Sequence, residues 1–597
     1  MSDREALIEA IRENPDDDTP RLILADWYEE NGESARGEFM RVQCELARLD
    51  PTSPRYPELH IRQLQIQAER EAEWFGGLAD RLVRWEFRRG MLDDITICPE
   101  PYCTDGESLF RSHPIWRVSF VDASGESLEP TAIRDVLSQK HSQFIRAIDA
   151  AGCQPDEQAA AMFGGRIYTN SWLNKLASAT SLGGLRELSL FGGTRGGRDN
   201  IDPETWQAFC AAEHLRGLQH LDLSNLYDYP GHSGAWEPVI RVLAESVFAS
   251  ELRSLRFDGC YIIPDAIRHL TRSRRFGRLQ TLSSGVPLPN SATREVLPEL
   301  LDPDMLPALR DLSVPYSRHL TEVVDHPGWQ RLERIGLVRT DDNQARDPEI
   351  HRPIWRAFFR SPHLRPTAFR VASPGYYDLE DAGFWDELVG AAWFGDLREL
   401  DIGLYDQSCA PLFIRSLDGF PQLRALSLNP DTDLVELLAA WPGLESLTEL
   451  DLNDSFGSTE PEASVKLFSS PYLTPRLTRL RASGICRSPE AVSALAGCPA
   501  LVGLQHLDFA FNELSRASAE VITASPYLRN LRGLHTWSEW DQETADGSNT
   551  THSWLILGNP QAFPQLRDVV IGSASTEELQ TELSRRFGPR LRVFSDC

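Results

Sequence analysis

Leucine and other apolar residues recur along most of the chain in the order L-x-x-L-x-L. Ten clear copies of this motif begin at Leu185, Leu218, Leu252, Leu309, Leu332, Leu397, Leu423, Leu447, Leu504 and Leu566. Seven weaker copies begin at Leu92, Ile115, Ile145, Leu279, Pro366, Leu477 and Leu531. The mean spacing of these starts is about 30 residues, which indicates a repeat architecture whose units stack on their neighbours.

The spacing inside the motif predicts a short strand. The second and third apolar positions lie two residues apart, so both side chains point into the core, and the residues between them point to the opposite face. Helical stretches follow, such as the one that begins near Ser488 and ends at Gly497. Each unit is therefore strand, turn, helix and return loop. The predicted fold is an α/β solenoid with a curved parallel sheet on its concave side and helices on its convex side.

The first 74 residues show a different, helical pattern. Ser2 and Glu5 have the spacing of a capping box, which predicts a short first helix to about Glu13. Thr19 is expected to cap a second helix that has Pro20 at its first position and ends at 31–32, where Asn-Gly favours a left-handed cap. A third helix is expected from about residue 34, and a fourth between residues 57 and 74.

Several short motifs of this segment resemble the bacterial repeat-companion domain, a small module found ahead of repeat arrays. They are NPDDDTPRL at 14–22, LADW at 24–27, ENG at 30–32 and RGEF at 36–39. The resemblance covers roughly residues 3–50 and implies little about activity. Asp16, Asp17, Asp18 and Asp26 could form a docking element, or they could serve a helix-capping turn in a small packed bundle.

The repeats resemble the leucine-rich repeat family, in its longer, helix-containing and intracellular form, over roughly residues 85–597. The Asn or Cys that this family places after the strand occurs at Cys260 and Asn512, but other residues stand there in several units. An irregular array is therefore expected, with insertions or long loops at 191–209, 283–300 and 340–355. The predicted domains are a helical module (1–50), a helical linker and N-terminal cap (51–91), and a solenoid of about 17 repeats (92–597).

Charge and composition argue against some classes of binding partner. The chain has 88 Asp and Glu against 60 Lys and Arg, a net charge of -28. Nucleic-acid and anionic-membrane binders draw affinity from clustered cations, so we expect neither partner. The first residues lack a signal-peptide pattern and no apolar run approaches 18 residues, which predicts a cytoplasmic protein. The ten cysteines have no metal or redox spacing and are expected to be reduced and mostly buried.

We find no catalytic motif in the sequence. The stretch 192–197 is rich in glycine but lacks the Gly-Lys-Ser/Thr of a phosphate-binding loop. The 14 histidines form no HExxH-like pair, and His113, His220 and His506 are expected to be structural. The prediction is a protein without enzymatic activity, cofactor or metal.

Residues that project from the strands to the concave face are the candidate binding residues. Acidic and basic side chains alternate there, which suits specific recognition of a protein. The candidates are Glu187, Asp222, Arg256, Arg334, Glu399, Asp401, Glu449, Asp451, Arg479, Arg481, Asp508 and His535. For any single residue, a merely solvated sheet face is the alternative interpretation.

The first functional hypothesis is a monomeric, non-enzymatic scaffold that binds a protein partner on its concave face. The alternative is a regulator of an enzyme, either a GTPase activator or an enzyme inhibitor, as some leucine-rich repeat proteins are. An activator would need a functional side chain on a rim loop, and the candidates are Arg195, Arg198 and Asn200.

Overall fold

The structure is a computed structural model of the whole chain. It describes residues 2–49, 53–75, 77–121, 130–150, 169–190, 201–224, 236–258, 260, 264–283, 290–316, 318–339, 348–372, 384–402, 422–454, 458–512, 515–536, 554–559, 561–572, 577–587 and 591–594. Two compact units result. The first comprises Met1–Gly125, Gln139–Ile145 and Leu438–Cys597, and the second comprises Glu126–Ser138 and Arg146–Leu437.

Four helices begin the first unit: α1 (Asp3–Glu13), α2 (Thr19–Glu30), α3 (Ser34–Leu46) and α4 (Tyr56–Trp74). The predicted capping box is confirmed, because the Glu5 amide donates to Ser2 Oγ at 3.3 Å and the Ser2 amide donates to Glu5 at 2.9 Å. Gly32 ends α2 with φ of 86°, as predicted. The predicted cap at Thr19 is wrong, since Thr19 lies inside α2 and donates its amide to Asp17 Oδ1 at 2.9 Å.

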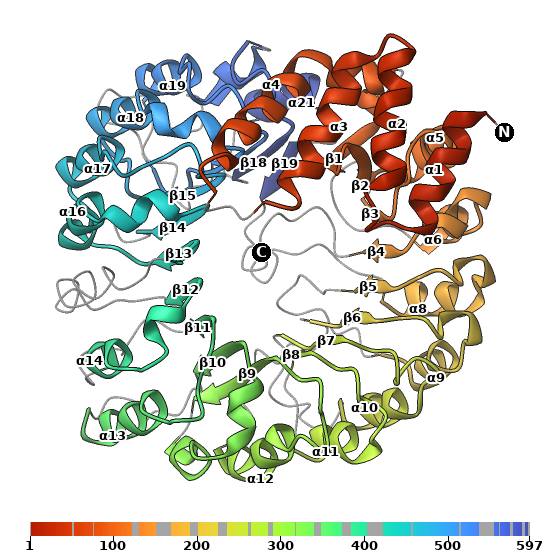
Figure 1. Cartoon of the computed structure of the whole chain (residues 1–597), viewed down its shortest axis with the longest axis vertical. Helices are drawn as coiled ribbons and strands as arrows, with labels where there is room; N and C mark the ends of the chain where they lie inside the picture. Colours follow the sequence, from red (N-terminus) through yellow and green to blue (C-terminus); the bar gives the residue numbers. More distant parts are fainter. Residues whose placement is uncertain are drawn as a thin grey trace. The chain divides into compact units, whose positions relative to one another are not determined.

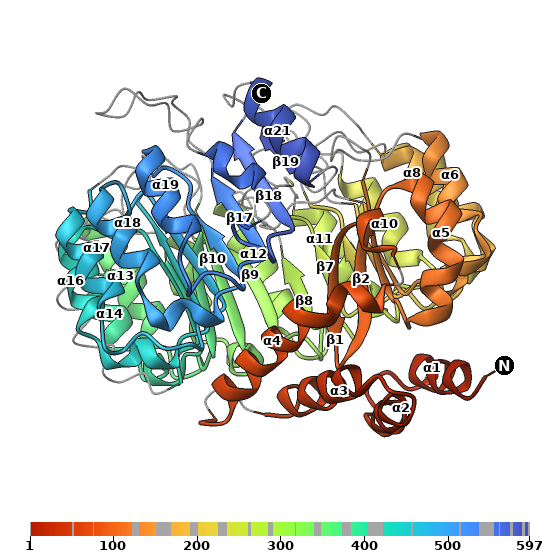
Figure 2. The same ribbon diagram turned by 90° about the horizontal axis from the view of Figure 1, so that it is seen from above.

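An antiparallel hairpin connects the helices to the repeats. It consists of β1 (Leu82–Arg88) and β2 (Met91–Ile97), joined by Arg89 and Gly90, both with positive φ. Met91 packs into the cluster of buried residues that also contains Ile11, Leu24 and Met40 from the helices. Figure 2 shows α1, α2 and α3 beside this hairpin. The helical module therefore shares its apolar core with the first strands.

The second unit is a run of parallel strands, each paired with the next. They are β4 (Ala147–Asp149), β5 (Glu187–Ser189), β6 (His220–Asp222), β7 (Ser254–Arg256), β8 (Thr281–Ser283), β9 (Asp311–Tyr316), β10 (Arg334–Arg339), β11 (Ala368–Ala372), β12 (Glu399–Ile402) and β13 (Ala425–Leu428). Its helices are α6 (Pro130–Leu137), α8 (Thr169–Ser178), α9 (Pro203–Cys210), α10 (Trp236–Glu245), α11 (Pro264–Ser273), α12 (Asn290–Leu301), α13 (Pro348–Phe359), α14 (Phe384–Val389) and α16 (Thr432–Ala439). Within this unit the strands line the inner side and the helices the outer side (Figure 1).

The first unit contains the same strand–helix alternation. Its parallel strands are β3 (Arg117–Phe120), which pairs with β2, and β14 (Glu449–Asn453), β15 (Arg479–Ser483), β16 (His506–Asp508), β17 (Gly533–Thr536), β18 (Asp568–Gly572) and β19 (Leu591–Phe594). Its repeat helices are α5 (Pro99–Ser112), α17 (Pro461–Phe468), α18 (Pro489–Ala496), α19 (Arg516–Thr523) and α21 (Glu577–Phe587). The fold is the predicted α/β leucine-rich repeat solenoid with a small helical module.

A strand begins two residues after each predicted motif start except Leu92, which lies inside β2. Around β5, for example, Leu185, Leu188 and Leu190 are buried, while Ser189 between them is only partly so. The residue expected after the strand also acts as expected. Asn512 donates to the Ala482 carbonyl at 2.7 Å and accepts from the Cys486 amide at 2.6 Å, and so satisfies loop backbone groups.

Three expected loops turn out to contain repeat helices. Helix α9 begins within 191–209, α12 within 283–300 and α13 within 340–355, so the prediction of insertions or long loops there is wrong for the residues that the structure describes. Helices α12 and α13 tolerate an internal proline, Pro298 and Pro353 respectively, which sequence reasoning treats as a helix end. The array is therefore more regular than expected.

Helix α4 and strand β1 pack against the last repeats of the first unit. His60 Nε2 lies 3.1 Å from the Gly503 carbonyl, and Arg476 donates to the Ser53 carbonyl at 3.2 Å. Glu71 forms a buried ion pair with Arg567. Segments that are more than 400 residues apart in sequence thus share one packed unit.

Candidate protein-binding face

The polar face of β14 to β17 is organised around Arg481. In the parallel register, Asp451, Arg481, Asp508 and His535 stand side by side on four successive strands. Arg481 lies 3.0 Å from a carboxylate oxygen of Asp451 and 3.0 Å from one of Asp508. His535 Nδ1 lies 3.7 Å from Asp508. The position between the two inward-facing residues of each strand thus places oppositely charged and hydrogen-bonding side chains next to each other across strands.

The charges of this cluster are strongly coupled. Burial alone would raise the pKa of Asp508, but the hydrogen bond with His535 and the charge of Arg481 hold that pKa well below its usual range. The amide of Ala510 also donates to Asp508, at 3.0 Å. Asp508 is therefore an ionised acid whose two carboxylate oxygens both have partners within the chain.

The second unit carries similar pairs on its strands. Arg256 lies 3.0 Å from Asp258 and 3.9 Å from Asp222, its neighbour in register on β6. Burial raises the pKa of Asp222 to about 6, although the charge of Arg256 opposes this rise. Further along, Arg370 pairs with Asp401 at 3.0 Å.

The predicted residues divide between the two units. Glu187, Asp222, Arg256, Arg334, Glu399 and Asp401 lie on strands β5 to β12 of the second unit. Glu449, Asp451, Arg479, Arg481, Asp508 and His535 lie on strands β14 to β17 of the first unit. Within each unit the candidates share one strand face, and many of them are ion-paired with each other.

Two partners on this face were missing from the sequence-based candidates. Arg370 occupies the central position of the weak motif that begins at Pro366, so the repeat itself could have indicated it. Asp258 lies two residues after β7, beyond the motif, and accepts from Arg256 and from Ser283 Oγ at 2.6 Å. No spacing rule marks that position.

The rim-loop candidates and the candidate docking acids differ from the strand-face residues in what the structure shows of them. Arg195, Arg198 and Asn200 lie outside the described residues. Of the candidate docking acids, Asp18 is buried and pairs with Arg48 and with Arg89, the latter at 3.2 Å. Asp26 pairs with Arg41. These contacts within the chain favour the structural interpretation of the acids.

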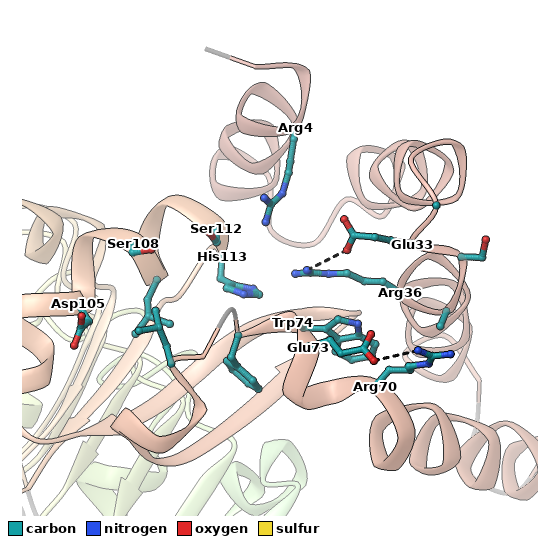
Figure 3. A pocket seen from close by; sticks show the side chains of 16 residues that line it. Arg4, Glu33, Arg36, Arg70, Glu73, Trp74, Asp105, Ser108, Ser112 and His113 are labelled. Carbon is teal, nitrogen blue, oxygen red and sulfur yellow. Dashed lines mark hydrogen bonds and ion pairs between the residues drawn. The ribbon is translucent and has the colours of Figure 1, made fainter.

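A pocket that the sequence did not reveal lies between the helical module and helix α5 of the first unit. It has a volume of about 760 Å³. Arg4, Arg36, Trp74 and His113 are among the residues that line it (Figure 3).

Comparisons with known proteins give structural neighbours only. No family model matches the chain, and no curated protein matches it. A structure of Rad7 and Elc1 in complex from yeast covers 92% of this chain and 97% of its own, at 14% identity and a TM-score of 0.29. The leucine-rich repeat-containing protein LegL7 from Legionella pneumophila covers 55% and 96%, at 14% identity and a TM-score of 0.32. A protein from Bacteroides fragilis covers 53% and 73%, at 12% identity and a TM-score of 0.26. These scores are low, so the fold assignment rests on the strand–helix repeat itself.

Proposed function

We propose that this chain is a non-enzymatic leucine-rich repeat scaffold that binds a protein partner through the polar face of its strands. The observation that carries the proposal is the cluster around Arg481, in which Asp451, Arg481, Asp508 and His535 on four successive strands contact one another in turn. Side chains that are fixed before binding lose less conformational entropy when a partner docks. A mixed-sign surface also selects a partner by charge complementarity more than by bulk attraction.

Binding energy would come from the more exposed residues around this cluster. Glu449 and Arg479 are neighbours in register at the start of β14 and β15, and both are exposed. Arg481 and Asp508 have side chains only 17% and 19% exposed, so reversing their charge would disturb the protein's own structure. The exposed pair is therefore the better probe of partner binding.

The test compares two double charge reversals in the full chain. E449K/R479E reverses the exposed pair on the strand face, and R516E/E520K reverses an exposed pair on helix α19 with the same net charge change. Proteins that co-purify from the native host are identified for each variant. We expect a partner that is retained by R516E/E520K and lost by E449K/R479E. An identical set of partners with both variants would refute binding at this face.

The proposal also covers the cellular compartment, the oligomeric state and the N-terminal domain of the protein. Cys44, Cys210, Cys260, Cys486 and Cys498 are buried thiols. Burial raises the pKa of Cys44 to about 12, which keeps it protonated. Such thiols suit the reducing cytoplasm, where we place a monomeric protein whose N-terminal helices form a bacterial repeat-companion domain. Within the described part of the chain, no helix has the length and apolar content needed to cross a bilayer.

A further inference from the structure

We propose that the pocket between α1, α3, α4 and α5 binds a carboxylate through Arg36. The pocket is lined by residues of the first unit, and none of the strand-face candidates is among them. Its volume of about 760 Å³ is in the range of pockets that hold small molecules or the end of a peptide.

Arg36 is a buried cation with too few partners. Its side chain is only 5% exposed, and the one carboxylate that it contacts among the described residues is Glu33, with Nη1 to Oε2 at 3.7 Å, longer than a hydrogen bond. Burial lowers the pKa of the guanidinium, as expected for a charge taken out of water. The guanidinium lies over two aromatic rings, with Cζ 4.5 Å from the Tyr28 ring centre and 5.9 Å from that of Trp74. An anion would supply the interaction that this cation lacks.

The unused atoms of Arg36 indicate which anion fits. Nε and Nη2 have no hydrogen-bond partner among the described residues. These two groups lie on the same edge of the planar guanidinium, and that edge binds the two oxygens of a carboxylate with parallel hydrogen bonds. The Glu33 contact uses the other terminal nitrogen, Nη1, so it leaves this edge unoccupied.

Neighbouring groups add to the attraction for an anion. Arg4 of α1 and His113 after α5 point toward Arg36 in Figure 3. The Nε of Arg4 and the Nδ1 of His113 are likewise buried and lack hydrogen-bond partners in the described part of the structure. Burial and the charges of Arg36 and Arg4 hold the pKa of His113 well below its usual value, so the ring is neutral and the positive charge beside Arg36 comes from Arg4.

Three acids also line the pocket. Glu33 lies 3.7 Å from Arg36, Glu73 pairs with Arg70 at 3.0 Å, and Asp105 lies 3.8 Å from Arg81. Glu73 and Asp105 are thus each engaged by another arginine, and Glu33 faces Arg36 only at the longer distance. Trp74 and Phe75 provide an apolar wall for whatever carries the carboxylate.

The carboxylate could belong to a free small molecule or to the C terminus of a peptide, and the experiment separates these sources. Isothermal titration calorimetry on the full chain uses four probes: benzoate, an N-acetylated dipeptide with a free C-terminal carboxylate, its C-terminal amide, and inorganic phosphate. We expect at least one of the two carboxylates to bind and the amide to fail. Benzoate alone would indicate a small-molecule ligand, and the peptide carboxylate alone a peptide C terminus.

Variants then connect binding to Arg36. R36M removes the charge and should weaken carboxylate binding ten-fold or more, since charge-assisted bidentate contacts are the strong ones. R36K keeps the charge but loses the guanidinium edge that donates two parallel hydrogen bonds. Its affinity for the carboxylate should lie between those of R36M and the unchanged protein. The matched control is R21M, because Arg21 is also a buried arginine of the helical module but does not line the pocket. Circular dichroism melting of each variant checks its folding.

Several results would overturn the proposal. They are the absence of binding by both carboxylates in the millimolar range, equal affinity of the amide, tighter binding of phosphate than of either carboxylate, and unchanged affinity in folded R36M. An equal loss of affinity in R21M and R36M would also overturn it, because the effect would then reflect the stability of the module.

Discussion

Glu71 of α4 and Arg567, just before β18, form a buried ion pair, with side chains 6% and 10% exposed. Trp85 of β1 completes the arrangement: its indole nitrogen donates to Glu71 at 2.9 Å, and the guanidinium of Arg567 lies 4.1 Å from the centre of its ring. Gln67 also donates to Glu71, at 3.1 Å. This satisfied network fixes an early helix to one of the last repeats.

Breaking this pair from one side should be costly. R567M leaves the buried Glu71 carboxylate without its cation, and we expect the free energy of unfolding to fall by about 3–5 kcal/mol. E71M/R567M should be less destabilised than R567M, because no uncompensated charge remains. Urea denaturation measures both. R516M on helix α19, which removes one side of an exposed pair, should change stability by less than about 1 kcal/mol.

Alanine substitutions at two glycines with positive φ should distinguish the cost of backbone strain from the cost of steric overlap. Gly77 and Gly90 have φ of 88° and 83°, but a Cβ at Gly77 would meet no atom of the described residues within 4 Å, whereas one at Gly90 would collide with Met40 of α3. G77A should cost about 1–2 kcal/mol from strain alone. G90A should cost about 1–3 kcal/mol more, because it also pushes the hairpin away from the helices. Equal costs in urea denaturation would contradict this close packing.

Asn512 should contribute more to stability than its counterpart Cys260. Asn512 is buried and its side chain makes three hydrogen bonds to backbone groups, at 2.6, 2.7 and 3.2 Å. N512A should lower the free energy of unfolding by about 1–3 kcal/mol, since buried backbone groups lose their partners. C260A loses weaker thiol contacts, the shorter being 3.3 Å to the Leu223 carbonyl, and should cost less. Thermal melting of both variants tests this order.

Asp222 should make stability depend on pH in a defined direction. Its pKa is about 6 in the folded protein against 3.8 for an ordinary aspartate, with burial as the main cause. Between these values the folded state holds a proton that the unfolded state has released, so this group's contribution to stability falls as pH rises from about 4 to 6. The D222N variant lacks this dependence.

Relative to D222N, the unchanged protein should lose about 1–3 kcal/mol of its free energy of unfolding across this pH range. Urea denaturation at several pH values measures the difference. D265N, at an exposed position on α11, serves as the control and should leave the pH profile unchanged. A difference between D222N and the unchanged protein that does not vary with pH would contradict the burial of a costly charge at Asp222.

The repeat was predictable because its physics is local. A strand with two inward-facing apolar residues has the same sequence pattern wherever it occurs. Even the weak motif that begins at Pro366 therefore identified β11. Helices α12 and α13 were not predicted because Pro298 and Pro353 lie inside them, and proline usually marks the end of a helix. Helix α9 could have been found, since Asp202 caps it by accepting from the Thr205 amide at 2.8 Å, and Pro203 occupies its first position.

The candidate sites were predictable only in part. Alternation along each strand places Arg481 and Asp508 on the polar face, but their mutual pairing depends on the register between strands, which the motif spacing only implies. The Arg36 pocket joins side chains from four helices and their ends, so no spacing in the sequence indicates it. The pocket is recognised by a buried charge that has too few partners, and this can be found only in the folded structure.

The Glu71–Arg567 contact also bears on how the chain is made. The arginine is encoded 496 residues after the glutamate (567 minus 71), and a ribosome adds roughly 5–20 residues per second. Helix α4 must therefore wait about 25–100 s after its own synthesis for the partner that neutralises Glu71. During that interval the growing chain carries a half-covered helix and an acid that is still in water. The completed first unit is a late event of biosynthesis, even though it contains the first residues made.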